Sequence, residues 1–293
     1  MTAPETFPLR APGDELPLQL RRWAPTGAEA VGSVVILHGM GEHGGRYVPF
    51  AEALAAAGLW VWVPDLRGHG ASPGPGGLGD LGAGGWEALL ADVTALVQLA
   101  AEHRPGLPVV LFGHSMGSLA AQCFAVERSR LLDGLVLAGS TCFDQLPPPA
   151  EGEDPLAAFN AAFAPARTPW DWLSRDPERV DAYAADPVCG TSLTPEGLAG
   201  LRASAERLAD PALLRRIRND LPVRLDAGDA DPLNDGGRLL TELAERWREA
   251  GVRELELHLW PGARHELLQE TNRDEISAEL VRWISGVCLR HPG

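Results

Sequence analysis

The chain has 293 residues, of which 45% are hydrophobic, and its 40 acidic against 25 basic residues give a formal net charge of −15. This length and apolar content are sufficient to bury a large core. Because nucleic acid and anionic lipid surfaces both require clustered cations, the charge argues against both as partners.

Apolar runs alternate with helical patterns along the first half of the chain. In chain order we expect an edge strand at 18–23, a strand at 33–37, a helix at 47–57, a strand at 59–63, a helix at 86–103, a strand at 109–112, a helix at 118–125 and a strand at 135–138. Solid apolar runs such as the one at 33–37 are typical of strands covered on both faces. The alternation predicts a doubly wound, mostly parallel α/β sheet with helices on both faces.

The alternation stops between residues 143 and 219. That segment has no strand-like run, but an N-cap residue followed by proline, a common helix start, occurs at Asp154, Thr168, Asp176, Thr194 and Asp210. Strands at 222–225 and 255–260 and helices at 237–250 and 274–287 follow. We therefore expect one core, residues 1–142 and 220–293, interrupted by an inserted helical cap at 143–219.

The N-terminus and the cysteines indicate the compartment. The first twenty residues hold prolines and charges in place of a secretory apolar segment, and no apolar run approaches the ~18 residues of a membrane span. The four cysteines are scattered singly, with no C-x-x-C pair. We expect a cytoplasmic protein with reduced thiols, and neither a disulfide nor a zinc site.

A G-x-S-x-G segment, residues 113–117 (GHSMG), lies between an expected strand and an expected helix. In that context the serine sits on a sharp turn and is held out as a nucleophile. Residues 70–74 (GASPG) fit the same pattern but do not run from strand into helix. The residue after the nucleophile must also donate its backbone N–H, and Pro73 has none. Ser115 is therefore the predicted nucleophile, and Ser72 is a loop serine.

A serine nucleophile needs a general base, and the base needs a carboxylate that fixes its tautomer. Both partners are expected in loops at the carboxyl ends of later strands. His265 directly follows the last strand and is the predicted base. The strand at 222–225 leads to Asp226, Asp229 and Asp231. Since Asp226 still belongs to the strand and Asp229 is typical of a turn beside glycine, we favour Asp231 as the acid, with Asp229 as the alternative.

Two backbone N–H groups must point at the oxyanion that forms during the reaction. Met116 supplies the first, because it follows the predicted nucleophile. The glycine-rich loop at 38–47 (HGMGEHGGRY) is expected to supply the second from Met40. His38 and His43 in this loop are accompanied by no third ligand pattern, so we expect no metal and no cofactor.

Five segments match, in order, those of a known group of enzymes: 38–47 (HGMGEHGGRY), 65–72 (DLRGHGAS), 113–117 (GHSMG), Gly228 with Asp231, and 264–266 (RHE). Together they closely resemble the monoacylglycerol lipase and lysophospholipase branch, similar to serine aminopeptidase S33, of the α/β-hydrolase superfamily. The resemblance implies hydrolysis of a lipid carboxylic ester, through an acyl-enzyme, beneath a mobile helical cap. It assigns Ser115, Asp231 and His265 to a triad and Met40 and Met116 to the oxyanion hole.

The sequence departs from the pattern at Ser118, where these lipases commonly have a second glycine. Asp65, Arg67 and His69 are interpreted as structural residues that hold the loop near the site by hydrogen bonds.

Apolar residues of the expected cap are candidates to line an acyl tunnel: Leu146, Leu156, Phe159, Phe163, Trp170, Trp172 and Leu173. Phe159, Phe163, Trp170 and Trp172 are our candidate substrate contacts. The alternative is that such residues simply pack the cap on the core. With its negative charge, the protein is expected to make at most transient contact with a membrane or micelle.

Other functions remain open on the sequence alone. A small-ester carboxylesterase and an amide or peptide hydrolase of the related aminopeptidase type need the same residues. A non-catalytic binding protein on this fold is a remote alternative, because such proteins usually lose a triad member and none is missing here. The sequence does not indicate the acyl chain length, the head group or the oligomeric state.

Overall fold

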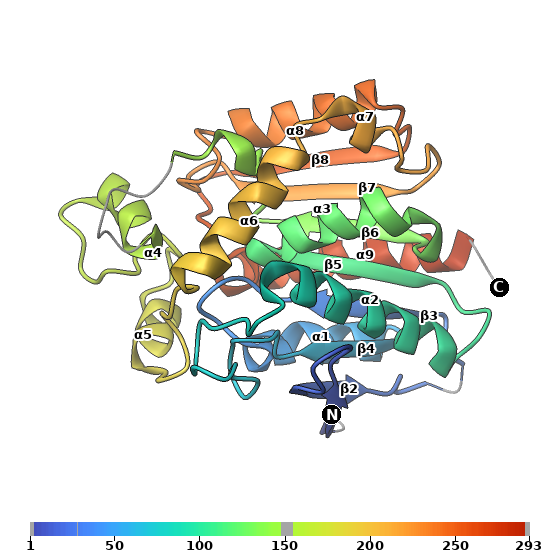
Figure 1. Cartoon of the computed structure of the whole chain (residues 1–293). Coiled ribbons are helices and arrows are strands. Elements are labelled where there is room, and N and C mark those ends of the chain that lie inside the picture. Colours follow the sequence, from blue (N-terminus) through green and yellow to red (C-terminus); the bar gives the residue numbers. More distant parts are fainter. Residues whose placement is uncertain (1–2, 28, 148–154, 291–293) are drawn as a thin grey trace.

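An eight-stranded sheet forms the centre of the computed structural model, which describes residues 3–27, 29–147 and 155–290 (Figure 1). Its strands are β1 (Glu5–Arg10), β2 (Pro17–Trp23), β3 (Gly32–Leu37), β4 (Leu59–Pro64), β5 (Val109–His114), β6 (Gly134–Ala138), β7 (Val223–Gly228) and β8 (Leu255–Trp260). They lie in the order β1-β2-β4-β3-β5-β6-β7-β8. The strands from β4 to β8 pair in parallel, whereas β1 and β2 are antiparallel to their neighbours.

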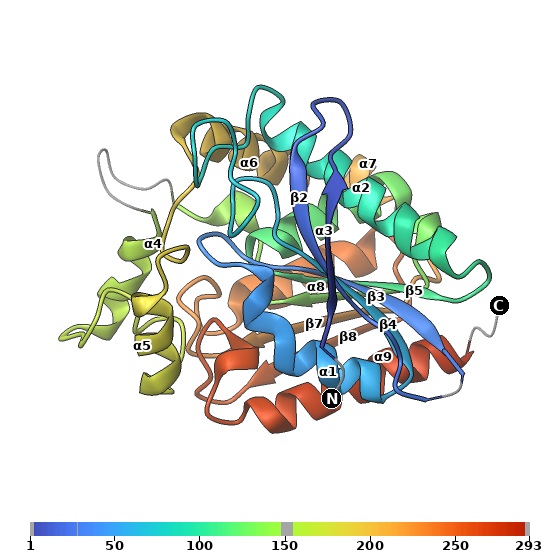
Figure 2. The ribbon, with the colours of Figure 1, turned by 90° about the horizontal axis from the view of Figure 1, so that it is seen from below.

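Helices cover both faces of the sheet, which confirms the doubly wound fold (Figure 2). On one face lie α1 (Val48–Ala56) and α9 (Arg273–Arg290), and on the other lie α2 (Gly85–His103), α3 (Met116–Arg128) and α8 (Arg238–Glu249). Strands β3 and β5 are buried along their whole length, because side chains on both of their faces meet a helical layer.

The N-terminal edge differs from our prediction. The strand expected at the edge, β2, lies between β1 and β4, and β1 itself was missed. Strand β1 contains Pro8 and its side chains are mostly exposed or half-buried, so it lacks an apolar pattern. A proline is tolerated there because an edge strand leaves one row of N–H groups unpaired.

The segment between β6 and β7, which we call the helical insertion, holds short helices and no strand in its described residues. These helices are η3 (Phe143–Gln145), α4 (Pro155–Ala158), η4 (Phe159–Phe163), α5 (Pro177–Ala185), α6 (Pro195–Arg207) and α7 (Pro211–Leu214).

Three of the expected helix starts are confirmed, since the side chains of Asp176, Thr194 and Asp210 cap α5, α6 and α7. Asp154 lies outside the described residues. The start expected at Thr168 is wrong: its hydroxyl accepts the Trp170 N–H in a turn with no helix after it.

The insertion packs in two different ways. Its outer part, residues 155–192, forms a small separate apolar cluster around Trp172 and Tyr183, which Leu233 of the body joins. Its inner part, residues 193–219, joins the main core through side chains such as Leu193 and Ile217. Figure 1 shows α4 and α5 standing to one side while α6 runs along the body. No helix in the described residues is both long and apolar enough to cross a membrane.

Candidate active site

Ser115 stands at the junction of β5 and α3 in a strained backbone conformation, with φ 51° and ψ −120°. The flanking glycines are required by the tightness of this turn. A Cβ on Gly113 would lie 2.5 Å from the Gly117 carbonyl oxygen, and a Cβ on Gly117 would lie 2.4 Å from the Leu37 carbonyl oxygen. The turn therefore holds the serine out between strand and helix, as a nucleophile elbow does.

His265 and Asp231 are in direct contact, although 34 residues separate them. Nδ1 of His265 lies 2.8 Å from Oδ2 of Asp231, and both side chains are buried. Burial disfavours the imidazolium, but Asp231, together with Glu266 and Glu42, outweighs that cost and raises the pKa of His265 above its usual value. The pair is thus arranged to hold a proton on the side of the ring that faces the carboxylate.

The three candidate acids have different partners. Asp231 accepts hydrogen bonds from the Leu233 backbone N–H at 2.9 Å and from Asn234 at 3.2 Å, which orient its carboxylate toward His265. Asp229 instead accepts the Gly262 N–H at 2.6 Å and serves a turn. Asp226 belongs to β7, as expected, and binds Arg224 and Trp260. Of the three, Asp231 is the one whose geometry suits a partner of the histidine.

Two aromatic rings pack against His265. The ring of His114, from the elbow, lies 4.8 Å away, and that of Trp172, from the helical insertion, lies 4.9 Å away. Burial, together with the neighbouring His265, lowers the pKa of His114 to about 4. His114 therefore stays neutral and does not compete for the proton that His265 would accept.

The N–H groups of Met40 and Met116 have no acceptor among the described residues. Both methionines line the same cavity as Ser115. Unpaired backbone donors are uncommon in a folded interior, so two of them beside one serine suggest a place for an incoming oxygen. This arrangement is consistent with the predicted oxyanion hole.

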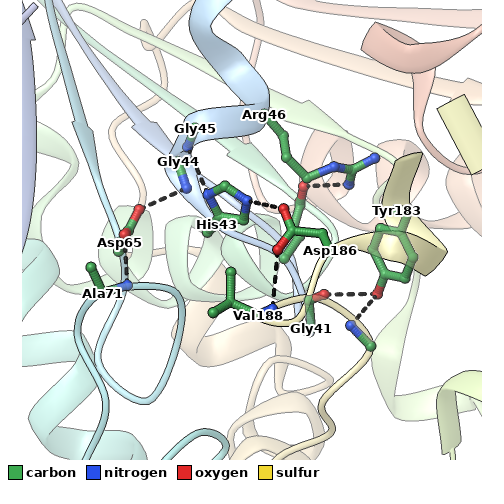
Figure 3. A network of polar contacts seen from close by, with 12 residues as sticks. Gly41, His43, Gly44, Gly45, Arg46, Asp65, Ala71, Tyr183, Asp186 and Val188 are labelled. Carbon is green, nitrogen blue, oxygen red and sulfur yellow. Dashed lines mark hydrogen bonds and ion pairs between the residues drawn. The ribbon is translucent and has the colours of Figure 1, made fainter.

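The glycine-rich loop at 38–47 is anchored to the outer insertion, as Figure 3 shows. The Gly41 carbonyl accepts hydrogen bonds from the Tyr183 hydroxyl and from the Gly190 N–H, both at 2.8 Å. Nε2 of His43 lies 3.0 Å from Oδ2 of Asp186. One segment of the insertion therefore holds the loop at two points.

Asp65 anchors the same loop from the body. Its carboxylate accepts the Gly44 and Ala71 N–H groups, each at 2.9 Å (Figure 3). It also pairs with Arg21. Arg67 is fully buried and bridges Asp92 and Asp14, which secures the following loop. These contacts bear out the structural role expected for Asp65 and Arg67.

A buried ion-pair network joins the loop at 38–47 to the loop after β8, which carries His265 and which we call the histidine loop. Glu42 accepts hydrogen bonds from the Gly39 N–H at 2.6 Å and from Arg46 at 2.9 Å. Arg46 also binds Glu266, the residue after His265, at 2.7 Å. Burial would raise the pKa of Glu42, but Arg46 and the nearby histidines outweigh it and bring it to about 2. The Glu42 carboxylate is therefore ionised, and through Arg46 it holds the two loops together.

Two groups of potential metal ligands lie beside the site in the described residues: His43 with Asp186 and Cys189, and Glu42 with His114 and Glu266. Ligand atoms of His43, Asp186 and Cys189 lie within 4.8 Å of one another. However, Nδ1 of His43 accepts the Gly45 N–H at 3.1 Å, so the ring proton must sit on Nε2, facing Asp186. A metal on Nε2 would push that proton onto Nδ1, against another donor. His43 therefore fits a hydrogen bond from Nε2–H to Asp186 and not a metal, and in the second group Glu42 and Glu266 both bind Arg46 instead.

A cavity of about 440 Å³ opens at Ser115. Its wall is almost entirely apolar and comes from the body and from both parts of the insertion. The lining residues are Met40, Ser115, Met116, Phe143, Leu146, Pro147, Leu156, Phe159, Trp172, Pro195, Leu198, Ala199, Leu201, Arg202, Ala205 and Leu233.

Two of the four candidate substrate contacts, Phe159 and Trp172, line this cavity, with their rings 5.1 Å apart. Phe163 and Trp170 do not. Phe163 lies under the Arg264 guanidinium, 4.3 Å from its centre, and the Trp170 ring packs 5.2 Å from that of Tyr183. As substrate contacts, these two are not supported by the structure.

Sequence reasoning missed the contribution of α6 to the cavity. Its lining residues recur at i, i+3, i+4, i+6, i+7 and i+10, which places them on one helical face: Pro195, Leu198, Ala199, Leu201, Arg202 and Ala205. That spacing could have been recognised in the sequence. The sequence did not show which part of the molecule this helical face would pack against.

We call the loops after β3, β5, β7 and β8 the strand-end loops. The first three thus contribute to one apolar cavity that includes a serine elbow, and the loop after β8 places His265 against Asp231. This combination defines a serine hydrolase of the α/β-hydrolase class. The chain belongs to the serine aminopeptidase S33 family, which matches residues 28–272.

Relatives and solved structures agree with that membership. The chain is 31% identical to a monoacylglycerol lipase of Mycolicibacterium smegmatis, over 89% of this chain and 90% of the relative. It is also 31% identical to a monoglyceride lipase of Homo sapiens, over 97% and 95% of the two chains. Its fold resembles that of a carboxyl esterase from Bacillus coagulans solved in complex with glycerol, with a TM-score of 0.86 and 24% identity over 98% and 100% of the chains.

Proposed function

We propose that this protein hydrolyses carboxylic esters of lipid-like molecules, of the monoacylglycerol or lysophospholipid type, with Ser115 as its nucleophile. The observation that supports this best is the position of Ser115: it lies on a strained elbow and lines a mostly apolar cavity. The names of the two relatives point to the same substrate class.

In the proposed mechanism, the ester carbonyl oxygen lies between the N–H groups of Met40 and Met116. His265 takes the proton of Ser115 as its hydroxyl attacks the carbonyl carbon, while Asp231 stabilises the resulting imidazolium. The alcohol leaves with that proton, and the acyl group stays on the serine. Water then attacks the acyl-enzyme with His265 again as the base, which releases the acid and restores the serine.

The helical insertion at 143–219 is proposed to act as the cap over this site. It provides most of the apolar wall, and Phe159 and Trp172 are its proposed substrate contacts. An apolar cavity of about 440 Å³ is within the range of small-molecule sites and suits an acyl chain better than a charged peptide. Contact with a membrane or micelle would be transient, given the net charge of −15.

An amide or peptide hydrolase, as the family description suggests, and a small-ester carboxylesterase use the same catalytic residues. A substrate panel distinguishes these alternatives. The wild-type protein should hydrolyse monoacylglycerols or lysophospholipids with a higher kcat/KM than a short nitrophenyl ester, and aminoacyl amides least.

The matched control is Ser115→Ala, which should reduce kcat/KM at least about 10³-fold, since the covalent step needs the hydroxyl. The proposal is wrong if this variant keeps wild-type activity, or if aminoacyl amides prove the best substrates.

A further inference from the structure

The Gly39–Met40 peptide group lies between the cavity and the buried side chain of His38. Its N–H belongs to Met40 and is the second proposed oxyanion donor. Its carbonyl oxygen belongs to Gly39 and lies 2.8 Å from Nδ1 of His38. The inference below rests on the proposed function, because it concerns how that donor is aimed.

The tautomer of His38 follows from its other contact. Nε2 of His38 lies 2.8 Å from the Leu66 backbone nitrogen, which can only donate. Nε2 must therefore be the unprotonated nitrogen, and the ring proton must sit on Nδ1. It follows that His38 donates this proton to the Gly39 carbonyl.

Because the peptide group is planar, this contact also affects the direction of the Met40 N–H. The carbonyl and the N–H of a trans peptide lie in one plane and point in opposite directions. A donor that holds the Gly39 oxygen on one side therefore sets the direction of the Met40 N–H on the other. The preceding His38–Gly39 peptide is held as well, since Glu42 accepts the Gly39 N–H at 2.6 Å.

The aimed group lies close to the nucleophile. A Cβ on Gly39 would be 3.1 Å from Cβ of Ser115, so the backbone passes directly beside the elbow. Three neighbouring peptide groups are held, by Glu42 at the Gly39 N–H, by His38 at the Gly39 carbonyl and by Tyr183 at the Gly41 carbonyl. The Met40 N–H is left without an acceptor among the described residues.

We propose that His38 is a positioning residue of the oxyanion hole: its Nδ1–H holds the Gly39 carbonyl and thereby directs the Met40 N–H at the developing oxyanion. His38 does not touch the substrate and exchanges no proton during the reaction. Its complete burial lowers its pKa, so the ring keeps one neutral tautomer while His265 is protonated and deprotonated.

Two isosteric variants separate the two contacts of the ring. In His38→Asn the side-chain amide nitrogen can occupy the position of Nδ1 and still donate to the Gly39 carbonyl, but nothing accepts the Leu66 N–H. In His38→Gln the amide oxygen can reach the position of Nε2 and accept the Leu66 N–H, but the donor to Gly39 is lost. His69→Gln serves as a control, because its ring packs 5.3 Å from His38 and its Nδ1 contacts the Arg67 carbonyl.

The probe is a fluorophosphonate, whose phosphoryl oxygen must enter the oxyanion hole when Ser115 attacks the phosphorus. The second-order labelling rate is measured on the folded fraction of each protein, and kcat and KM are measured with a nitrophenyl ester. His38→Gln should label about 10²-fold more slowly than wild type, as expected when an oxyanion donor is lost, with a lower kcat and an unchanged KM. His38→Asn should stay within about tenfold of wild type, and His69→Gln within about threefold.

Three results would overturn the inference: His38→Gln labelling at the wild-type rate, His38→Asn losing as much as His38→Gln, or the loss appearing in KM alone. If the variants do not fold, ¹⁵N NMR spectra of histidine in the wild type test the tautomer of His38 directly. His38 should show a protonated Nδ1 and a bare Nε2 from pH 5 to 9, and a protonated Nε2 or a titration in that range would refute it.

Labelling also separates this inference from the proposed function. If wild type labels at Ser115 but hydrolyses no lipid ester, the substrate class is wrong while the His38 comparison still stands. If wild type does not label at all, both proposals fail.

Discussion

The strand-end loops and the outer insertion meet at one cavity but are held very differently. In the loops, the His265 and Asp231 side chains are 2% and 0% exposed. In the outer insertion, the pair that ties it to the glycine-rich loop is half-buried, with His43 17% and Asp186 31% exposed. The difference teaches that the His265–Asp231 pair is enclosed by the body, while the insertion, which is held by a more exposed contact, forms much of the cavity wall.

The two regions are joined at Glu270. This carboxylate is fully buried and accepts hydrogen bonds from the backbone N–H groups of Arg175, in the insertion, and Arg264, in the histidine loop, at 3.1 and 2.9 Å. Its second oxygen binds the Arg175 side chain at 2.8 Å. One side chain thus fastens the outer insertion to the loop that carries His265.

The largest effect is expected from the acid of the strand-end loops. Asp231→Asn should reduce kcat about 10⁴-fold, because an amide at that position favours the wrong tautomer of His265. Asp229→Asn is the matched control, since Asp229 only accepts the Gly262 N–H in a turn, and it should keep kcat within about threefold of wild type. Equal losses in the two variants would show that the acid is not assigned correctly.

The next effect concerns the junction. Glu270→Gln should lower the free energy of unfolding by about 1–3 kcal/mol, because it weakens charge-assisted hydrogen bonds in a buried place. Hydrogen exchange at residues 170–190 should accelerate more than exchange in β5. Arg167→Gln, which removes an exposed ion pair with Asp181, should change neither quantity measurably. If hydrogen exchange accelerated equally at residues 170–190 and in β5, Glu270 would not be a local connection between the insertion and the histidine loop.

A smaller effect is expected in the cavity wall. Phe159→Ala should raise KM for long-chain esters about tenfold, because it removes apolar contact with the chain, and should leave a short ester nearly unaffected. Phe163→Ala is the control, because Phe163 lies outside the lining and packs under Arg264. If both variants change KM alike, the outer insertion does not select substrates through its cavity-facing side chains.

The smallest effect is a shift in pH dependence. In the proposed mechanism His265 acts as a base in its neutral form, and its pKa is raised, because Asp231 with Glu266 and Glu42 outweighs the opposing cost of burial. Activity should therefore fall as the pH drops through a midpoint above 6.5, the ordinary histidine value. A kcat/KM profile of the free enzyme measures this midpoint, and a rate that is flat from pH 5 to 8 would exclude His265 as the base.

Patterns local in the sequence were predicted well. The strand at 255–260 was placed at its observed bounds, and the strand and helix around Ser115 were placed to within a few residues. Capping residues such as Asp176 and Thr194 marked helix starts, because a side chain two or three residues away satisfies the first N–H groups. Thr168 carried the same signal and failed, because Asp171 binds its hydroxyl and the chain turns there.

The composition, the alternation of strands and helices, and the serine elbow were determined by the sequence, because each depends on neighbouring residues along the chain. The contact of His265 with Asp231, the separation of Phe159 from Phe163 and the contact of His38 with the Leu66 N–H were decided only by the tertiary structure. They depend on which strand ends and which helix faces meet. Those contacts are determined by the free energy of burying the whole core, which cannot be read from any short segment of the sequence.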